Sequence, residues 1–250
     1  MSMVSYEAHG HIAEIALDHP PVNALTGSMI DELLSGFERA AADPLVRAVI
    51  LRSNVARRFC AGLDLGAVAL GTGGDLRALI EKLYVGLLDA QRALGKPSIA
   101  VVSGAARGGG MTLAISCDLI LAGDSATFGY PEIDVGLIPA IHYAHLPAIV
   151  GRYRAFDLLF SGRVFSAEEA AALGLVSQVV SDEELLDHAL EIARSLSAKP
   201  PSAMRLGRAA FKRVNETHYR ANVIAAVDDF CAVAGSEEAR ECALAYMEKR

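Results

Sequence analysis

The sequence predicts an α/β fold followed by a carboxy-terminal region that is almost wholly helical. Strand-like runs alternate with helical patterns over the first two thirds of the chain. Residues 98–103, 111–116 and 119–122 follow in strand, helix, strand order, which is typical of a parallel crossover. From residue 181 onward the apolar residues recur at helical spacing, with breaks at 199–201 and Gly235. A length of 250 residues allows one large unit with a sizeable core.

The amino-terminal elements are read from their periodicity. Residues 5–18 alternate apolar and polar side chains around Gly10, which predicts a hairpin of two short strands. Residues 28–42 carry apolar residues at helical spacing, and Asp43-Pro44 ends the pattern because proline disfavours helix in the residue before it. Residues 46–51 then read as a buried strand.

An amphipathic helix is predicted over residues 75–94. Its apolar face consists of Leu76, Leu79, Ile80, Leu83 and Leu87. The helix is expected to end at Gly95-Lys96-Pro97, because glycine and proline together stop a helix.

Two capping boxes are predicted in the last third of the chain. Ser166 and Ser181 each stand three residues before a glutamate at the head of an apolar-periodic segment. Gly174 fits the end of the first of these helices, because glycine enters the left-handed cap without steric cost.

Composition narrows the classes of function. The formal net charge of -7 argues against a broad nucleic-acid surface, which needs clustered lysine and arginine. The four cysteines have no zinc-type spacing and read as reduced thiols. The first eleven residues lack the pattern of a signal peptide, and no apolar run reaches the length of a membrane span, which predicts a cytoplasmic protein.

Two glycine-containing turns can present main-chain amides to a ligand. In residues 58–65, Gly62 allows close approach of the backbone, so that the amide of Leu63 can point into a cleft. In residues 103–112, three glycines stand between a strand and a helix start, where amides are unsatisfied and lie at the positive end of the helix dipole. Close helix packing is an equally good explanation of the glycines by themselves. Dinucleotide, phosphate-loop and serine-hydrolase motifs are absent from the sequence.

These turns belong to a longer series of motifs that resembles the crotonase family, the enoyl-CoA hydratases and isomerases. The amino-terminal motifs are Asn-Ala-Leu at 23–25, Phe-Cys-Ala-Gly-Leu-Asp-Leu at 59–65, glycine at 104 and 108–110, and Cys-Asp at 117–118. The later motifs are Phe-Gly-Tyr-Pro-Glu at 128–132, Gly-Leu-Ile-Pro at 136–139, Leu-Gly-Leu-Val at 173–176, Lys-Pro-Pro at 199–201 and Ser-Glu-Glu-Ala-Arg at 236–240. The resemblance therefore covers nearly the whole chain in order and spacing.

The resemblance implies a site for an acyl-CoA thioester, with no separate cofactor and no metal. The oxyanion-hole donors are the backbone amides of Leu63 and Gly109. The residues expected near CoA or substrate are Ala61, Asp64, Leu65, Thr112, Tyr246 and Lys249. Both oxyanion donors are main-chain groups, so leucine at position 63 is compatible with the role.

The reaction depends on two positions at which common hydratases of this family carry glutamate. In this sequence they are Thr112 and Glu132, so one acid–base carboxylate remains. A single carboxylate suffices to move a double bond, which slightly favours isomerisation of a 3-enoyl-CoA to a 2-enoyl-CoA. Hydration stays open if Thr112 positions the water, and so does an inactive homologue that only binds acyl-CoA.

His142 and His145 stand where common hydratases carry a glycine-rich run. No carboxylate or cysteine cluster accompanies them, so a metal site is not predicted. Either ring can instead shape the acyl pocket or act as an auxiliary acid. Asp134 is a spare carboxylate, and its two-residue offset from Glu132 would point it away from the site if this segment is extended.

The resemblance also implies the architecture and the assembly. It implies a spiral of repeated β-β-α turns over residues 1–195 and a helical region over 196–250 that belongs to the same structural unit. That region is expected to form homotrimers, which can pair into hexamers. The expected ligand is an acyl-CoA thioester, without nucleic-acid or membrane partners.

Overall fold

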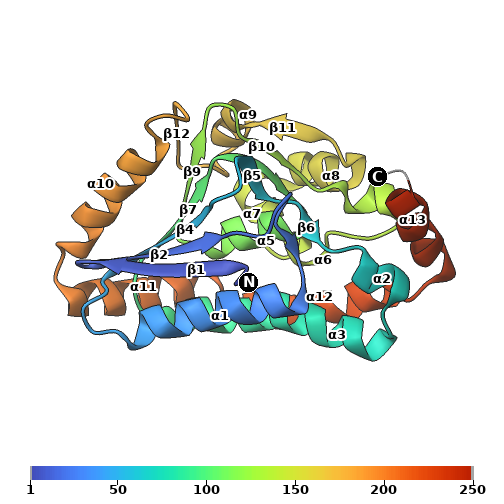
Figure 1. Cartoon of the computed structure of the whole chain (residues 1–250), viewed down its shortest axis with the longest axis horizontal. Coiled ribbons are helices and arrows are strands. Elements are labelled where there is room, and N and C mark those ends of the chain that lie inside the picture. Colours follow the sequence, from blue (N-terminus) through green and yellow to red (C-terminus); the bar gives the residue numbers. More distant parts are fainter. Residues whose placement is uncertain (1, 249–250) are drawn as a thin grey trace.

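Pairs of strands followed by helices recur along the first two thirds of the chain (Figure 1). The computed structural model describes residues 2–248. The first strand of each pair lies in a six-stranded sheet: β4 (Ala48–Ser53), β7 (Ser98–Val102) and β9 (Leu119–Gly123). The second strand lies in a four-stranded sheet: β5 (Arg57–Cys60), β8 (Gly104–Arg107) and β10 (Thr127–Gly129). This repetition confirms the predicted spiral of β-β-α turns.

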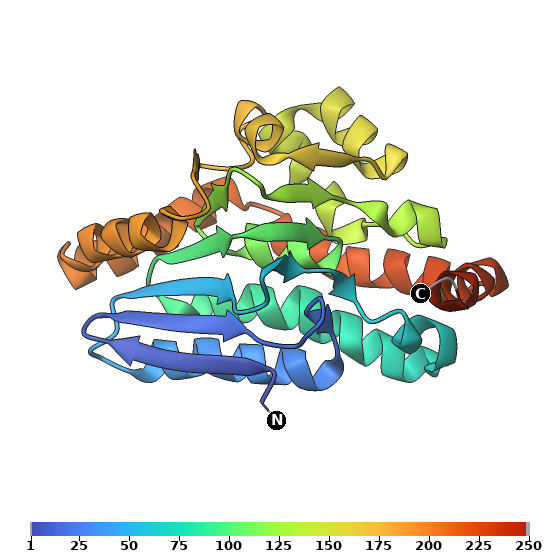
Figure 2. The same ribbon diagram turned by 45° about the horizontal axis from the view of Figure 1, so that its top comes forward.

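The six-stranded sheet has the order β1-β2-β4-β7-β9-β12. The expected hairpin is present as β1 (Val4–His9) and β2 (Ile12–Leu17), which pair antiparallel. Every later pairing in this sheet is parallel, through to β12 (Gln178–Val180). Figure 2 shows the strands following one another across the molecule, from the blue hairpin to the green strands.

Helices cover both faces of this sheet, because side chains alternate along each strand. On β4, Val49 and Leu51 belong to the main core, to which helix α1 (Gly27–Ala42) also contributes. Ala48 and Ile50 face the other way and join a smaller apolar cluster with α10 (Leu185–Ser197). Burial on both faces is characteristic of parallel sheets.

The segment predicted as one helix over 75–94 consists of three parts. These are α3 (Gly73–Glu81), a π-helical turn η1 (Lys82–Gly86) and α4 (Leu87–Leu94). The segment ends at Gly95, whose φ of 65° is left-handed, as expected from the sequence. All five residues of the predicted apolar face are nevertheless buried in the main core.

The two capping boxes have different outcomes. Ser166 Oγ accepts a hydrogen bond of 3.1 Å from the amide of Glu169, and it caps α9 (Ala167–Ala172). The carboxylate of Glu169 pairs with Arg163 instead of closing the box. The prediction at Ser181 was wrong: its hydroxyl donates to the carboxylate of Glu184, and α10 begins only after that residue.

The remaining elements complete the fold. The short ones are β3 (Ala24–Leu25), β6 (Gly62–Leu63), α2 (Gly66–Leu70), α5 (Gly109–Ser116), the 3-10 turn η2 (Pro131–Val135), α6 (Ala140–Tyr143), α7 (Leu146–Val150) and β11 (Val164–Ser166). The longer helices are α8 (Arg152–Ser161), α11 (Pro201–Asn215), α12 (Tyr219–Ala234) and α13 (Glu237–Glu248).

The carboxy-terminal helices are tied to the α/β layers by polar contacts. Arg208 of α11 donates to the carboxylate of Asp118 over 2.7 Å and to the carbonyl of Gln91 over 2.8 Å. Helix α12 contacts α3, η1 and α6, while α13 contacts α2 and η2. Among residues 2–248, no helix is both long and apolar enough to cross a membrane.

Candidate active site

The first amide-presenting turn runs from β5 into β6. Gly62 has a φ of 94°, which an L side chain rarely adopts, and the turn is held by pairing of β6 with β3. Asn23 is fully buried beneath it and donates to the carbonyl of Phe59 over 2.9 Å. The buried amide side chain therefore fixes the strand that leads into the turn.

The second turn runs from β8 into α5 and touches the first. Gly108 has a φ of 51°, and the helix begins at Gly109. A Cβ added at Gly62 would lie only 3.1 Å from the amide nitrogen of Gly109. Leu63 and Gly109 consequently line the same cavity, of about 240 Å³, which we call the first cavity.

Glu132 lies in the first cavity, on the 3-10 turn η2. Its carboxyl group packs on Gly108, where an added Cβ would lie 3.1 Å from Oε1. Oε2 is buried and has no hydrogen-bond partner among the described residues. Burial raises the pKa of Glu132 to about 7, and its own backbone amide opposes this only in part. The group can therefore both accept and return a proton near neutral pH.

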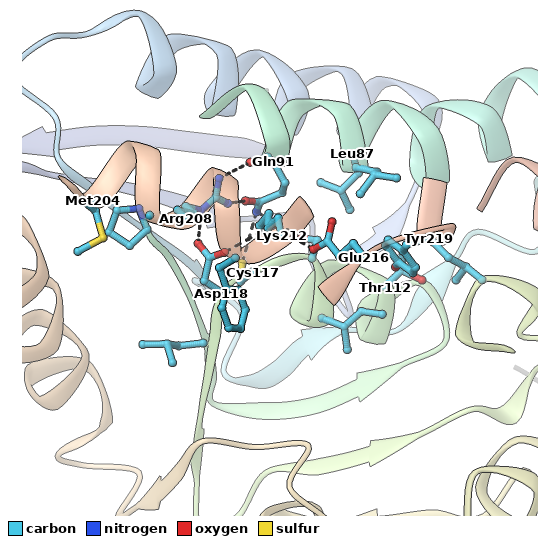
Figure 3. A pocket seen from close by; sticks show the side chains of 18 of the residues that line it. Leu87, Gln91, Thr112, Cys117, Asp118, Met204, Arg208, Lys212, Glu216 and Tyr219 are labelled. Carbon is cyan, nitrogen blue, oxygen red and sulfur yellow. Dashed lines mark hydrogen bonds and ion pairs between the residues drawn. The ribbon is translucent and has the colours of Figure 1, made fainter. Parts of the chain in front are cut away.

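Thr112 is buried but does not line the first cavity. It lines a second cavity of about 390 Å³, whose lining includes Tyr84, Leu87, Ile141 and Tyr219 (Figure 3). Thr112, which was expected to contact the substrate, therefore does not share a cavity with Glu132.

The hydroxyl of Thr112 faces the buried His142, which in turn lies next to the partly buried His145. Its Oγ1 lies 3.3 Å from Nε2 of His142, and Nδ1 of His142 lies 3.4 Å from Nε2 of His145. Burial lowers the pKa of His142 well below its usual range and that of His145 to about 4. Both rings are therefore neutral at physiological pH.

The residues expected near CoA lie along the first cavity. Ala61, Asp64, Leu65 and Tyr246 all line it, and Asp64 is exposed. Lys249 lies outside the described residues. Asp134 also lines this cavity together with Glu132. An extended segment would point the two side chains in opposite directions, but the segment is a 3-10 turn.

Sequence reasoning missed the apolar part of the first cavity. Leu83 and Tyr84 come from the π turn, Leu137 follows η2, and Phe230 comes from α12. Leu83 was expected only on the core face of a regular helix. A tyrosine within that apolar segment was the one visible signal, because a buried phenol needs a polar partner.

The fold and the cavity together define a class: an α/β spiral protein that brings two main-chain turns and one buried carboxyl group to a single site. Comparison with known proteins identifies that class further. The chain belongs to the enoyl-CoA hydratase/isomerase family, whose model matches residues 7–250. It is accordingly an enzyme that acts on acyl-CoA thioesters.

The similarity extends over whole chains. A 2,3-dehydroadipyl-CoA hydratase of Escherichia coli is 31% identical over 252 residues, covering 100% of this chain and 97% of the relative. A probable mitochondrial enoyl-CoA hydratase of Arabidopsis thaliana is 33% identical over 243 residues, covering 96% and 80%. The crystal structure of an enoyl-CoA hydratase from Mycobacterium avium subsp. paratuberculosis superposes with a TM-score of 0.88 at 26% identity, covering 99% and 96%.

Proposed function

We propose that this enzyme stabilises the enolate of an acyl-CoA thioester between the backbone amides of Leu63 and Gly109, with Glu132 as its acid–base group. The observation that carries the proposal is the contact between the two turns in the cavity that also holds the Glu132 carboxyl group. The amide of Gly109 stands at the start of α5, where the helix dipole favours a developing negative charge. CoA would lie along Ala61, Asp64, Leu65 and Tyr246.

Isomerisation of a 3-enoyl-CoA to a 2-enoyl-CoA needs only these groups. The Glu132 carboxylate removes a proton from C2, and the electron pair delocalises over the double bond and the thioester oxygen. The two amides stabilise the resulting dienolate. The protonated Glu132 then returns the proton to C4, which forms the 2-enoyl product and regenerates the carboxylate. A pKa of about 7 suits both halves of this cycle.

The position of Thr112 supports isomerisation over a hydration in which residues 112 and 132 together hold the water molecule. Its hydroxyl is engaged by His142, and it lines the second cavity. The first cavity therefore offers Glu132 no partner from position 112 for holding a water molecule.

Hydration of a 2-enoyl-CoA is a second candidate, because the hydroxyl of Thr112 is kept polar by its contact with His142. The names of the relatives, which are hydratases, point the same way. This reaction requires a movement that brings Thr112 to the water attacking C3, with Glu132 transferring both protons.

The deciding experiment offers the enzyme matched 2-enoyl- and 3-enoyl-CoA thioesters and identifies the products by mass spectrometry. We expect 3-enoyl-CoA to become 2-enoyl-CoA without a gain of 18 mass units, which is the signature of added water. Glu132→Gln should lower kcat by about 10²–10⁴-fold. Glu183→Gln, at an exposed carboxylate before α10, serves as the matched control and should keep full activity. Full turnover by Glu132→Gln would contradict the assignment of the base.

A further inference from the structure

Tyr84 is the one described residue that lines both cavities. It is only 4% exposed and lies in the π turn between α3 and α4. The residue before it, Leu83, lines the first cavity, whereas Leu87 and Leu88 of the next turn line the second. The change of direction between the two cavities therefore occurs at Tyr84.

The side chain of Tyr84 lies between the walls of the two cavities. Its ring meets Phe230, in the wall of the first cavity, edge to face with centroids 6.2 Å apart and an interplanar angle of 77°. Burial raises the pKa of its phenol, and the nearby backbone of Ile141, which lines the second cavity, opposes this in part. Tyr84 therefore contacts the wall of the first cavity and also lines the second, so its side chain stands between the two spaces.

The π-helical backbone is a separate indication of a functional position. Single π turns inside α-helices interrupt the regular ladder and occur frequently at functional sites. Here the turn spans Lys82–Gly86, with Tyr84 at its centre. The irregular backbone turns a bulky side chain toward the boundary between the cavities.

Apolar side chains lie beside Tyr84 in both cavities, and the Glu132 carboxyl group also lies near it in the first. In the first cavity Leu83 and Phe230 are buried beside it, and in the second cavity Leu87 and Ile141 are buried. Figure 3 shows Thr112, Leu87 and Tyr219 toward one end of the second cavity and Met204 at the other, with Arg208, Lys212 and Asp118 between them. An acyl chain that passed Tyr84 would meet the apolar side chains of Leu87 and Ile141 together with Thr112.

The volume of the first cavity limits what it can hold. About 240 Å³ is below the range of roughly 300–1,000 Å³ that is usual for whole-ligand pockets. We propose that Tyr84 determines acyl-chain length: it closes the first cavity to all but short acyl groups and keeps the second cavity as a blocked extension. This inference rests on the proposed function, in which the first cavity holds the thioester.

Binding of unreactive saturated acyl-CoA thioesters, from butanoyl to dodecanoyl, tests the partition by titration calorimetry without requiring turnover. For the unaltered enzyme we expect the affinity to stop rising after the first few carbons. For Tyr84→Ala we expect it to continue rising, by about fourfold per methylene group that enters apolar space, which corresponds to ~0.8 kcal/mol. Tyr84→Phe keeps the ring and should retain the early plateau. An unchanged plateau in a folded Tyr84→Ala enzyme would overturn the proposal.

A blocking substitution tests whether the added carbons enter the second cavity. Gly207 of α11 lines that cavity, and an added Cβ there meets no atom within 4 Å, so a side chain can be introduced without a clash at Cβ. Gly207→Phe in the Tyr84→Ala background should remove the gain for long chains. If the gain survives, the chain takes another route and the assignment of the second cavity is wrong.

Two further measurements keep the outcomes distinct. If circular dichroism shows that the Tyr84→Ala variant is unfolded, Tyr84→Leu takes its place, because leucine retains more of the buried volume. The affinity of Tyr84→Leu is also expected to continue rising with acyl-chain length. Turnover is measured separately on short and long 3-enoyl-CoA thioesters. An enzyme that binds the series as expected but converts none of it would contradict the proposed function and leave the partition standing.

Discussion

Glu132 combines two properties that ordinarily exclude each other: it is ionisable, and its Oε2 is buried without a partner. The glycine at position 108 leaves room for this carboxyl group, because an added Cβ there would crowd it at 3.1 Å from Oε1. The start of α5 next to it favours the charged form, yet burial outweighs this effect and raises the pKa to about 7. The residue is thereby half ionised near neutral pH.

The pH dependence of the reaction follows from this raised pKa. The base must be deprotonated in the free enzyme, so kcat/KM is expected to rise with pH and to level off above an inflection near 7. An unperturbed glutamate would give the inflection near 4.5. The profile is measured between pH 5 and 9 in buffers of constant ionic strength. A flat profile would be incompatible with Glu132 as the base.

Individual site residues differed in how far they could be predicted from sequence. Leu63, Gly109 and Glu132 lie in motifs that occur in the expected order, and these motifs were sufficient to predict that the three residues line one cavity. The pairing of Thr112 with His142 joins residues 30 positions apart on separate helices, and no local pattern encodes it. The role of Tyr84 depends on a backbone irregularity, which a search for helical spacing averages away.

The first residues of helix α5 pack directly against β5. A Cβ added at Gly110 would lie 2.3 Å from the carbonyl oxygen of Cys60, a distance that no real contact adopts. The absence of a side chain at Gly110 therefore sets how closely the two amide-bearing turns approach each other.

Gly110→Ala is expected to push α5 away from β5. Displacing one oxyanion donor should lower kcat by roughly 10²–10³-fold, and overpacking should reduce the free energy of unfolding by about 1–3 kcal/mol. Gly73→Ala is the matched control, because this exposed helical glycine has no atom within 4 Å of an added Cβ. Kinetics and urea denaturation measure the two effects. Equal activity of the two variants would show that α5 does not hold the donor in place.

Elements with strong apolar periodicity were predictable, and those set by distant contacts were not. Helix α1 begins within one residue of its expected start and ends at the expected residue, because Thr26 caps it and Pro44 follows its end. The prediction of a capping box at Ser181 was wrong because the Ser181 hydroxyl donates to the side chain of Glu184 and does not accept a hydrogen bond from a helix amide. Short strands such as β8 and β10 carry too few residues to show alternation, and their pairing partners stabilise them.

At the scale of the molecule, helix α11 has no buried residue although it carries large apolar side chains. Leu206, Phe211 and Val214 are 58%, 69% and 70% exposed. We predict that self-association of the chain through α11 buries these apolar groups, because exposed apolar groups that gather into a patch are typical of interaction surfaces. The expected trimer would provide such a contact.

The oligomeric state can be tested directly. Light scattering after size-exclusion chromatography should give three or six times the mass of one chain at micromolar concentration. Val214→Glu should reduce that mass, because a charge buried at an interface without a partner is costly. Glu183→Lys, at an exposed position before α10, should leave it unchanged. A monomeric unaltered enzyme would contradict the expectation.

The division into residues 1–195 and 196–250 as parts of one structural unit stays a prediction, and several contacts support it. Phe230 of α12 and Tyr246 of α13 line the first cavity together with residues of the α/β layers. Arg208 of α11 bonds to Asp118 at the head of β9. Removing the last helices would open the cavity in which the reaction is proposed.

The touching turns at Gly62 and Gly109 have a consequence for how this protein can diverge. Donors that belong to the main chain survive most replacements of the side chain they carry, because among single substitutions only proline removes the N–H group itself, and other changes can at most displace it. Relatives that share about a third of their residues with this chain can therefore carry main-chain donors at these two turns whatever their side chains there. A residue-by-residue comparison of such proteins registers side chains and does not register main-chain donors of this kind.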